Sequence, residues 1–123
     1  MVQRSVELCE VVSAITEQGP AASDAEFQQQ IRAAAQAAPS LIAEGFLRFT
    51  PGEIVRYLRM ARGELGEVQS NLKVGRRMKY FSTEDADRAE TLARRAMGTT
   101  TNLLKSKVRQ LELKTRSKRR KRP

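Results

Sequence analysis

Two groups of residues in this 123-residue chain could do chemistry: a carboxylate pair and a dense run of Lys and Arg. Glu64 and Glu67 are three residues apart, which places them one turn apart on a helix. Paired carboxylates can act as acid and base, but ion pairing with arginine is the more ordinary role. The chain has no His, the commonest general base and metal ligand near neutral pH. We therefore predict a protein that is not an enzyme and that has no catalytic, cofactor or metal site.

The single cysteine and the glycines do not change this prediction. Cys9 is the only cysteine, so no intrachain disulfide can form. Because the chain has no His, Cys9 also cannot form a Cys–His nucleophile. We expect its side chain to be a small buried hydrophobe. The glycines at 63, 66 and 75 lie within a helical pattern and follow no strand, so they do not indicate a phosphate-binding loop.

The basic run gives the strongest partner signal. Residues 1–104 contain 13 Lys or Arg and 13 Asp or Glu, so the whole net charge of +9 lies in residues 105–123. No aromatic residue lies among these basic residues, so the predicted binding to nucleic acid depends on charge and is sensitive to salt. The alternative is a solubilising tail without a ligand. The residues expected to contact phosphates are Lys114, Arg116, Lys118, Arg119, Arg120, Lys121 and Arg122.

Four helical segments must position these residues. The first is predicted over residues 2–17 and ends at Gly19-Pro20; the second begins at Ser23, with Glu26 completing a capping box. Thr50-Pro51-Gly52-Glu53 gives the third helix a Thr cap and a Pro in its first turn, and this helix is expected to extend to about Met78. The fourth follows a turn at residues 80–83.

Apolar residues repeat at helical spacing in each segment, and the third carries a heptad seam. Pro39 lies inside the second stripe, so we expect a kink near Ala35 and no break, because the stripe continues in phase. The predicted core residues are Leu8, Val12 and Ile15; Phe27, Ile31, Ala34, Ala38, Ile42 and Gly45; Ile54, Leu58, Ala61, Leu65, Val68 and Leu72; and Ala86, Ala89, Ala93, Ala96, Leu103 or Leu104, Val108 and Leu111.

Short connections make sequential helices antiparallel neighbours. The predicted fold is therefore all-α: an antiparallel up-down four-helix bundle over residues 1–112, followed by a basic, disordered tail over residues 113–123. No stretch approaches the roughly 20 apolar residues of a membrane span, and acidic residues in the N-terminal segment argue against a signal peptide. The expected location is the cytoplasm.

The two flanks of the third helix differ in charge. One flank carries Arg59 and Arg62, and the other carries Glu64 and Glu67 together with apolar and aromatic side chains, Tyr57 and Met60. These flanks can be two solvated edges. They can also form a head-to-tail interface in which the basic edge of one copy meets the acidic edge of the next, a contact that can close into a ring.

Residues 30–74 carry a recognisable pattern. Pro39, Ala43, Glu44, Gly45 and Arg48 precede the turn, and the next helix carries Leu58, Ala61, Arg62, Gly63, Leu65 and Glu67. This pattern resembles the bacterial four-helix-bundle family that is encoded in intervening sequences of 23S ribosomal RNA genes. Relatives of the retroelement accessory variability proteins belong to the same family. The chain departs from the pattern at Leu41, where Asn is common, and at Glu64, where Ser is common.

The resemblance implies a ring-shaped homopentamer and no settled biochemical activity. By spacing alone, Glu44 and Arg48 can be an ordinary i,i+4 ion pair on the surface of the second helix. The resemblance implies instead that they help to fix a helix or subunit contact. We therefore expect a non-enzymatic, oligomeric bundle that binds nucleic acid, with RNA favoured, through its basic tail and flanks. The alternative is an adaptor that binds a reverse transcriptase or another protein. The predicted interface residues between copies are Glu44, Arg48, Tyr57, Arg59, Met60, Arg62, Glu64 and Glu67.

Overall fold

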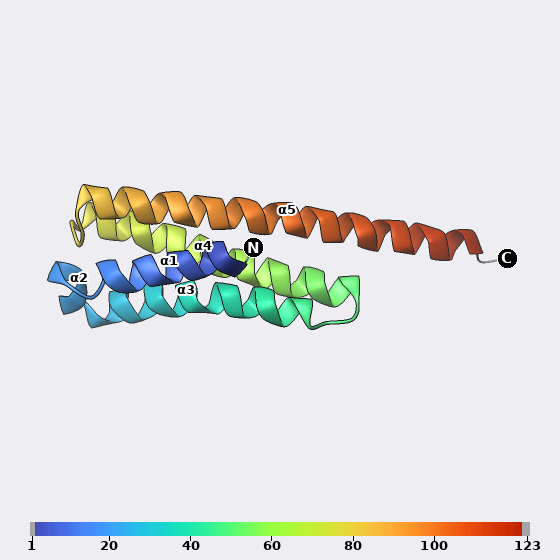
Figure 1. The fold of residues 1–123 in the computed structure, drawn as a ribbon, viewed down its shortest axis with the longest axis horizontal. Coiled ribbons are helices and arrows are strands. Elements are labelled where there is room, and N and C mark those ends of the chain that lie inside the picture. Colours follow the sequence, from blue (N-terminus) through green and yellow to red (C-terminus); the bar gives the residue numbers. More distant parts are fainter. Residues whose placement is uncertain (1, 122–123) are drawn as a thin grey trace.

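The computed structural model describes residues 2–121, which form four long helices and one short one (Figure 1). The prediction of an all-α, antiparallel four-helix bundle is confirmed. A single helical turn, α2, which the sequence pattern did not predict, joins the first long helix to the second. The helices are α1 (Val2–Ile15), α2 (Gly19–Ser23), α3 (Ala25–Phe46), α4 (Pro51–Arg77) and α5 (Thr83–Lys121).

The long helices pack in a closed cycle. Both α1 and α4 pack against α3 and α5. The apolar stripes predicted for the second and third helices face the core, with one shift: Val55 is buried and Ile54 is only half-buried. The largest fully buried apolar side chains are Leu8, Val12, Ile31, Ile42, Leu58, Leu65, Val68 and Leu72.

Local capping explains where the helices begin. The Thr50 hydroxyl accepts a hydrogen bond from the Glu53 amide, as the sequence predicts, and α4 begins at Pro51. In α3 the cap is Asp24, whose carboxylate accepts from the Phe27 amide, so the prediction of a Ser23 cap is wrong. Asp24 is one residue closer to the apolar stripe, and its side chain is also held by the Tyr80 hydroxyl, which donates to it at 2.6 Å. The helix α3 runs through Pro39 without a break.

The short first helix leaves one end of the bundle with three helices. At 14 residues α1 is about 21 Å long, whereas α3 has 22 residues and is about 33 Å long. In Figure 1 the N-terminus of α1 lies midway along the bundle. A separate core cluster fills this end, where α3, α4 and α5 meet and only Val2 at the start of α1 packs against it. It consists of Ile42, Val55, Leu58, Ala61 and Leu104.

The basic C-terminal segment is helical, so the prediction of a disordered tail is wrong for residues 113–121. Lys, Arg, Gln and Leu are strong helix formers, and neither Gly nor Pro occurs between Gly98 and Pro123. The packed part of α5 has already overcome the nucleation cost, so each further residue only propagates the helix. Cations near a helix C-terminus also interact favourably with its dipole. Arg122 lies outside the described residues.

Candidate functional site

The most strongly charged part of the molecule is the C-terminal half of α5, residues 105–121, which we call the basic extension. With 39 residues α5 is about 58 Å long, against about 40 Å for α4, and its last turns run past the end of the bundle (Figure 1). Every residue from Glu112 to Arg120 is exposed. The exposed cationic side chains are Lys105, Arg109, Lys114, Arg116, Lys118, Arg119 and Arg120; Lys121 is helical, but its side chain is not described.

Cations lie on both flanks of the extension. At 100° per residue, Lys105, Arg109 and Arg116 fall on one flank and Lys107, Lys114 and Lys118 fall on the other. The half-buried side chains of Val108 and Leu111 occupy the stripe between the flanks that continues from buried Leu104. Within residues 2–121 no carboxylate forms an ion pair with these cations. Their charge is therefore free to act on an external anion from two sides of one helix.

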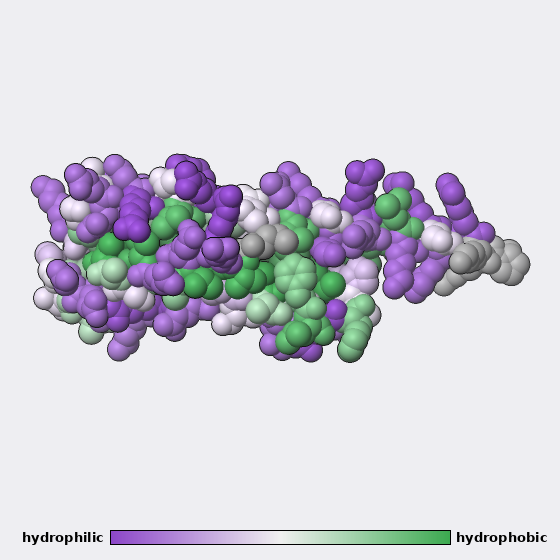
Figure 2. Space-filling model, viewed as in Figure 1, coloured by the Kyte–Doolittle hydropathy of each residue, from purple (hydrophilic) through white to green (hydrophobic). Residues whose placement is uncertain are grey.

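The end of α3 and the connection to α4, residues 46–49, which we call the apolar loop, lie at the same end of the bundle. Phe49 is fully exposed, Leu47 is 72% exposed and Phe46 is 43% exposed. Figure 2 shows hydrophobic side chains gathered over this end of the molecule. Sequence reasoning missed these residues. Their exposure could have been predicted, because Leu47 and Phe49 lie between Gly45, the last core position of one helix, and Thr50, the cap of the next.

Beside this loop, Glu44, Arg48 and Tyr57 form what we call the elbow. The Arg48 guanidinium donates to the Glu44 carboxylate at 2.8 Å and to the Tyr57 hydroxyl at 2.6 Å, and its central carbon lies 4.7 Å from the centroid of the Tyr57 ring. Gly45 makes this possible, because an added Cβ would lie 3.0 Å from the Tyr57 Cβ. The three residues, predicted at an interface between copies, thus also join α3 to α4 within one chain.

Charged side chains lie on both flanks of the buried stripe of α4. Arg59, Met60, Arg62 and Glu67 are exposed, and Glu64 is half-buried. Within the described part of the chain, none of the four charged residues forms an ion pair. The structure does not bring Arg59 or Arg62 to the acidic side of the same molecule.

Glu64 and Glu67 line what we call the acidic groove, a shallow groove between α3 and α4. Its walls are made of small residues, among them Ala33, Ala37 and Gly63. Partial burial, and then the charge of Glu67, raise the pKa of the Glu64 carboxyl above its usual range. A cation that entered this groove would relieve the repulsion between the Glu64 and Glu67 carboxylates.

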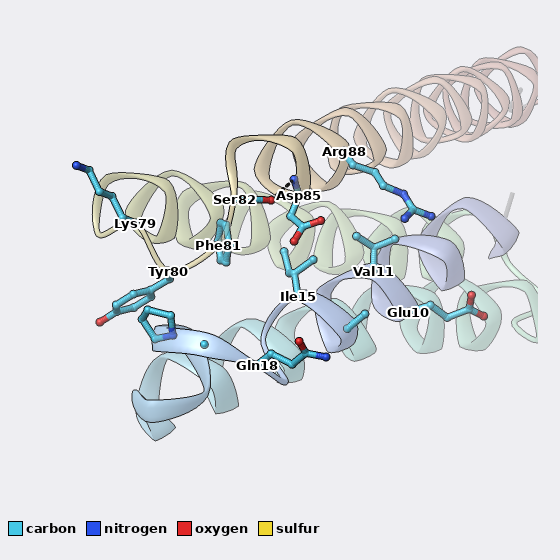
Figure 3. Close-up of a pocket in the computed structure, with 13 residues that line it drawn as sticks. Glu10, Val11, Ile15, Gln18, Lys79, Tyr80, Phe81, Ser82, Asp85 and Arg88 are labelled. Atoms are coloured by element: carbon cyan, nitrogen blue, oxygen red, sulfur yellow. Dashed lines mark hydrogen bonds between the residues drawn. The ribbon is translucent and has the colours of Figure 1, made fainter.

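A second cleft lies at the end of the bundle opposite the apolar loop (Figure 3). It is formed by α1, the residues that follow α1, and the residues at the start of α5. Its apolar side chains include Val11, Ile15 and Phe81, and Asp85 points into it. The Tyr80 hydroxyl points away and donates to Asp24, which lowers the pKa of that carboxyl. Within residues 2–121 no cluster of His, Cys, Asp and Glu is placed to hold a metal ion. The cleft shows no arrangement of a nucleophile with a base.

Residues 1–102 match the profile of the 23S rRNA-intervening sequence proteins. The chain belongs to this family. A crystal structure of a protein of unknown function from the S23 ribosomal protein family of Bacteroides thetaiotaomicron has the same fold, with a TM-score of 0.77 at 14% identity. The match covers 85% of this chain and 97% of that one. No significant match is found among curated proteins.

The family pattern acquires a physical meaning in this structure. Glu44, Gly45 and Arg48 build the elbow, and Gly63 and Glu67 line the acidic groove. The family match ends at residue 102, so the basic extension lies beyond it. Among the helices that the structure describes, none is long and apolar enough to cross a membrane.

Proposed function

We propose that this family member is a non-enzymatic, oligomeric protein that binds nucleic acid, with RNA as the ligand class, through the basic extension. The observation that carries the proposal is a helix with cations exposed on both flanks and only one acidic residue, Glu112, after residue 104. Phosphate oxygens are the anions that such a density of Lys and Arg attracts most strongly. A helical backbone fixes the spacing of these side chains before binding, which reduces the entropy lost on association.

Family membership favours RNA over DNA. The family is named for intervening sequences of 23S rRNA, and we take RNA as the ligand class on that ground. The extension itself offers phosphate contacts, which do not read sequence. We therefore expect RNA binding with weak sequence preference.

The proposal includes assembly through α4. Arg59 and Arg62 on one flank and Glu64 and Glu67 in the acidic groove have opposite charges and no ion-pair partner among the described residues of their own chain. A head-to-tail contact would bring the basic edge of one copy into the acidic groove of the next. A ring of five copies, as the family resemblance implies, would present five extensions to one RNA and strengthen binding through multivalency.

Removing equal charge from two places on α5 tests the proposal. Lys114→Gln with Lys118→Gln neutralises two exposed cations of the extension, whereas Arg94→Gln with Arg95→Gln neutralises two exposed cations on the bundle. On a duplex ligand each lost phosphate contact makes the slope of log affinity against log salt shallower by about 0.9. We expect the extension variant to lose one to two contacts, about 0.9–1.8 in slope, and the bundle variant to keep the slope of the unchanged protein. Equal effects from both variants would mean that the extension is not the binding element.

A further inference from the structure

The apolar side chains of the apolar loop are exposed to solvent, although such side chains are usually buried in a core. Three of its four residues are apolar, and Phe49 retains its full accessible surface. Single exposed apolar side chains are ordinary on soluble proteins, but a contiguous group of them marks an interaction site. The apolar loop is therefore expected to bind a partner that packs against aromatic and aliphatic side chains.

Packing at the end of the bundle places the first turn of α4, which follows this loop, against the start of the basic extension. Ile54, in the first turn of α4, belongs to the same core cluster as Leu103, Leu104 and Val108 of α5. The loop ends five residues before Ile54, and two cations of the extension, Lys107 and Arg109, flank Val108 in sequence. Figure 1 shows the α3–α4 connection at the end of the bundle that α5 runs past. The loop and the first turns of the extension thus lie at the same end of the bundle.

The loop is held in place from both sides. On one side the Leu47 and Arg48 amides donate to the Glu44 and Gly45 carbonyls, each at 3.1 Å, and the Arg48 side chain is fixed in the elbow. On the other side the Thr50 hydroxyl caps α4. Phe49 is therefore presented from an anchored backbone, which lowers the entropy lost when a planar partner packs on its ring.

We propose that the apolar loop binds unpaired bases of the nucleic acid whose phosphates the basic extension contacts, with the Phe49 ring stacking on a base. This inference rests on the proposed function. Single-stranded nucleic acid is the ligand class that needs both features, because proteins bind it with cations along the backbone and aromatic rings against successive bases. In a duplex the base faces are already stacked on one another, so the ring has nothing to cover. The loop thus selects RNA with unpaired bases over a fully paired duplex.

Two substitutions at Phe49 separate stacking from mere hydrophobicity. Phe49→Leu keeps an apolar side chain without a ring, and Phe49→Trp keeps a ring; neither disturbs packing, because the side chain is fully exposed. We expect Phe49→Leu to weaken binding of a short single-stranded RNA about tenfold, the loss of one stacked base, and to leave duplex binding unchanged. Phe49→Trp should bind the single strand at least as tightly as the unchanged protein. Since the chain has no other Trp, its fluorescence should be quenched by the single strand and not by the duplex.

Other results would overturn the inference. If Phe49→Leu binds the single strand as tightly as the unchanged protein, the ring does not stack. If Phe49→Ser instead lowers the mass measured by light scattering without changing single-strand affinity, the loop is a contact between copies of this chain. Both results would leave salt-dependent RNA binding by the extension in place. Absence of binding to either RNA at low salt would instead remove the proposed function itself.

Discussion

At the residue scale, the elbow shows how a sequence pattern becomes a contact. The pattern around Glu44, Gly45 and Arg48 was recognisable in the sequence, but the second partner of Arg48 was not, because Tyr57 lies nine residues away across a turn. Only the fold brings the guanidinium over the ring, and Gly45 leaves room for this approach, because an added Cβ would lie 3.0 Å from the Tyr57 Cβ. The candidate residues and the i,i+4 pair of Glu44 and Arg48 could thus be predicted from the sequence, whereas the contact of Arg48 with Tyr57 could not.

Two Gly→Ala substitutions test this account of the elbow. Gly45→Ala would place a Cβ 3.0 Å from the Tyr57 Cβ, tighter than ordinary packing, so we expect the free energy of unfolding to fall by about 1–3 kcal/mol. Gly63→Ala is the matched control in α4, because its added Cβ meets nothing within 4 Å; it should raise stability by up to about 1 kcal/mol through helix propensity. Urea unfolding followed by circular dichroism measures both. Stabilisation by Gly45→Ala would show that the close approach of Tyr57 is wrong.

At the element scale, the spacing of apolar residues was sufficient to predict the packed helices, but it did not predict that the basic extension is helical. The seam of α4 from Leu58 to Leu72 is buried as the 4-3 spacing predicts. The stretch after Leu113 has no apolar residue to pack, so the pattern favoured disorder; helix propensity and continuity with α5 instead keep it helical. The half-buried Ile54 and the short α2 were not predictable, because each depends on how neighbouring helices meet.

A proline placed in the extension tests whether its helical form contributes to binding. Ser117→Pro keeps every charge but removes a helical hydrogen bond and clashes with the preceding turn, at a cost of about 3 kcal/mol in a helix interior. We expect helix content to fall by circular dichroism and RNA affinity to fall several-fold, because the cations lose their fixed spacing. Ser117→Ala is the control and should change neither quantity; Ser117 is exposed, so the bundle should fold in both variants. Unchanged affinity in Ser117→Pro would indicate that charge alone determines binding.

At the scale of the whole molecule, charge is separated along the long axis. The bundle is nearly neutral, the acidic groove and the basic edge lie on opposite flanks of α4, and the extension carries the net charge at one end. The length of α1 adds a second asymmetry, since it leaves the extension end of the bundle with three helices. Both asymmetries distinguish the two ends of the molecule and are consistent with a directional, head-to-tail assembly.

Charge reversal tests the assembly. Light scattering at micromolar concentration should give a mass several times 13.8 kDa. Glu64→Lys with Glu67→Lys should lower that mass, because the acidic groove would then repel the basic edge of the next copy. Adding Arg59→Glu and Arg62→Glu should partly restore it by exchanging the two charges. A monomer at every concentration would exclude the proposed interface.

The central claim is that the basic extension binds nucleic acid, and a salt titration of the chain shortened to end at Leu113 tests it most directly. The deletion removes seven cations, Lys114 to Arg122, and no buried residue among those described, so the bundle should stay folded by circular dichroism. A duplex ligand isolates phosphate contacts from stacking. With about four or five contacts, log affinity of the full chain should fall against log salt with a slope near −4, and the shortened chain should lose most of its affinity. A shortened chain that binds as tightly and with the same slope would contradict the claim.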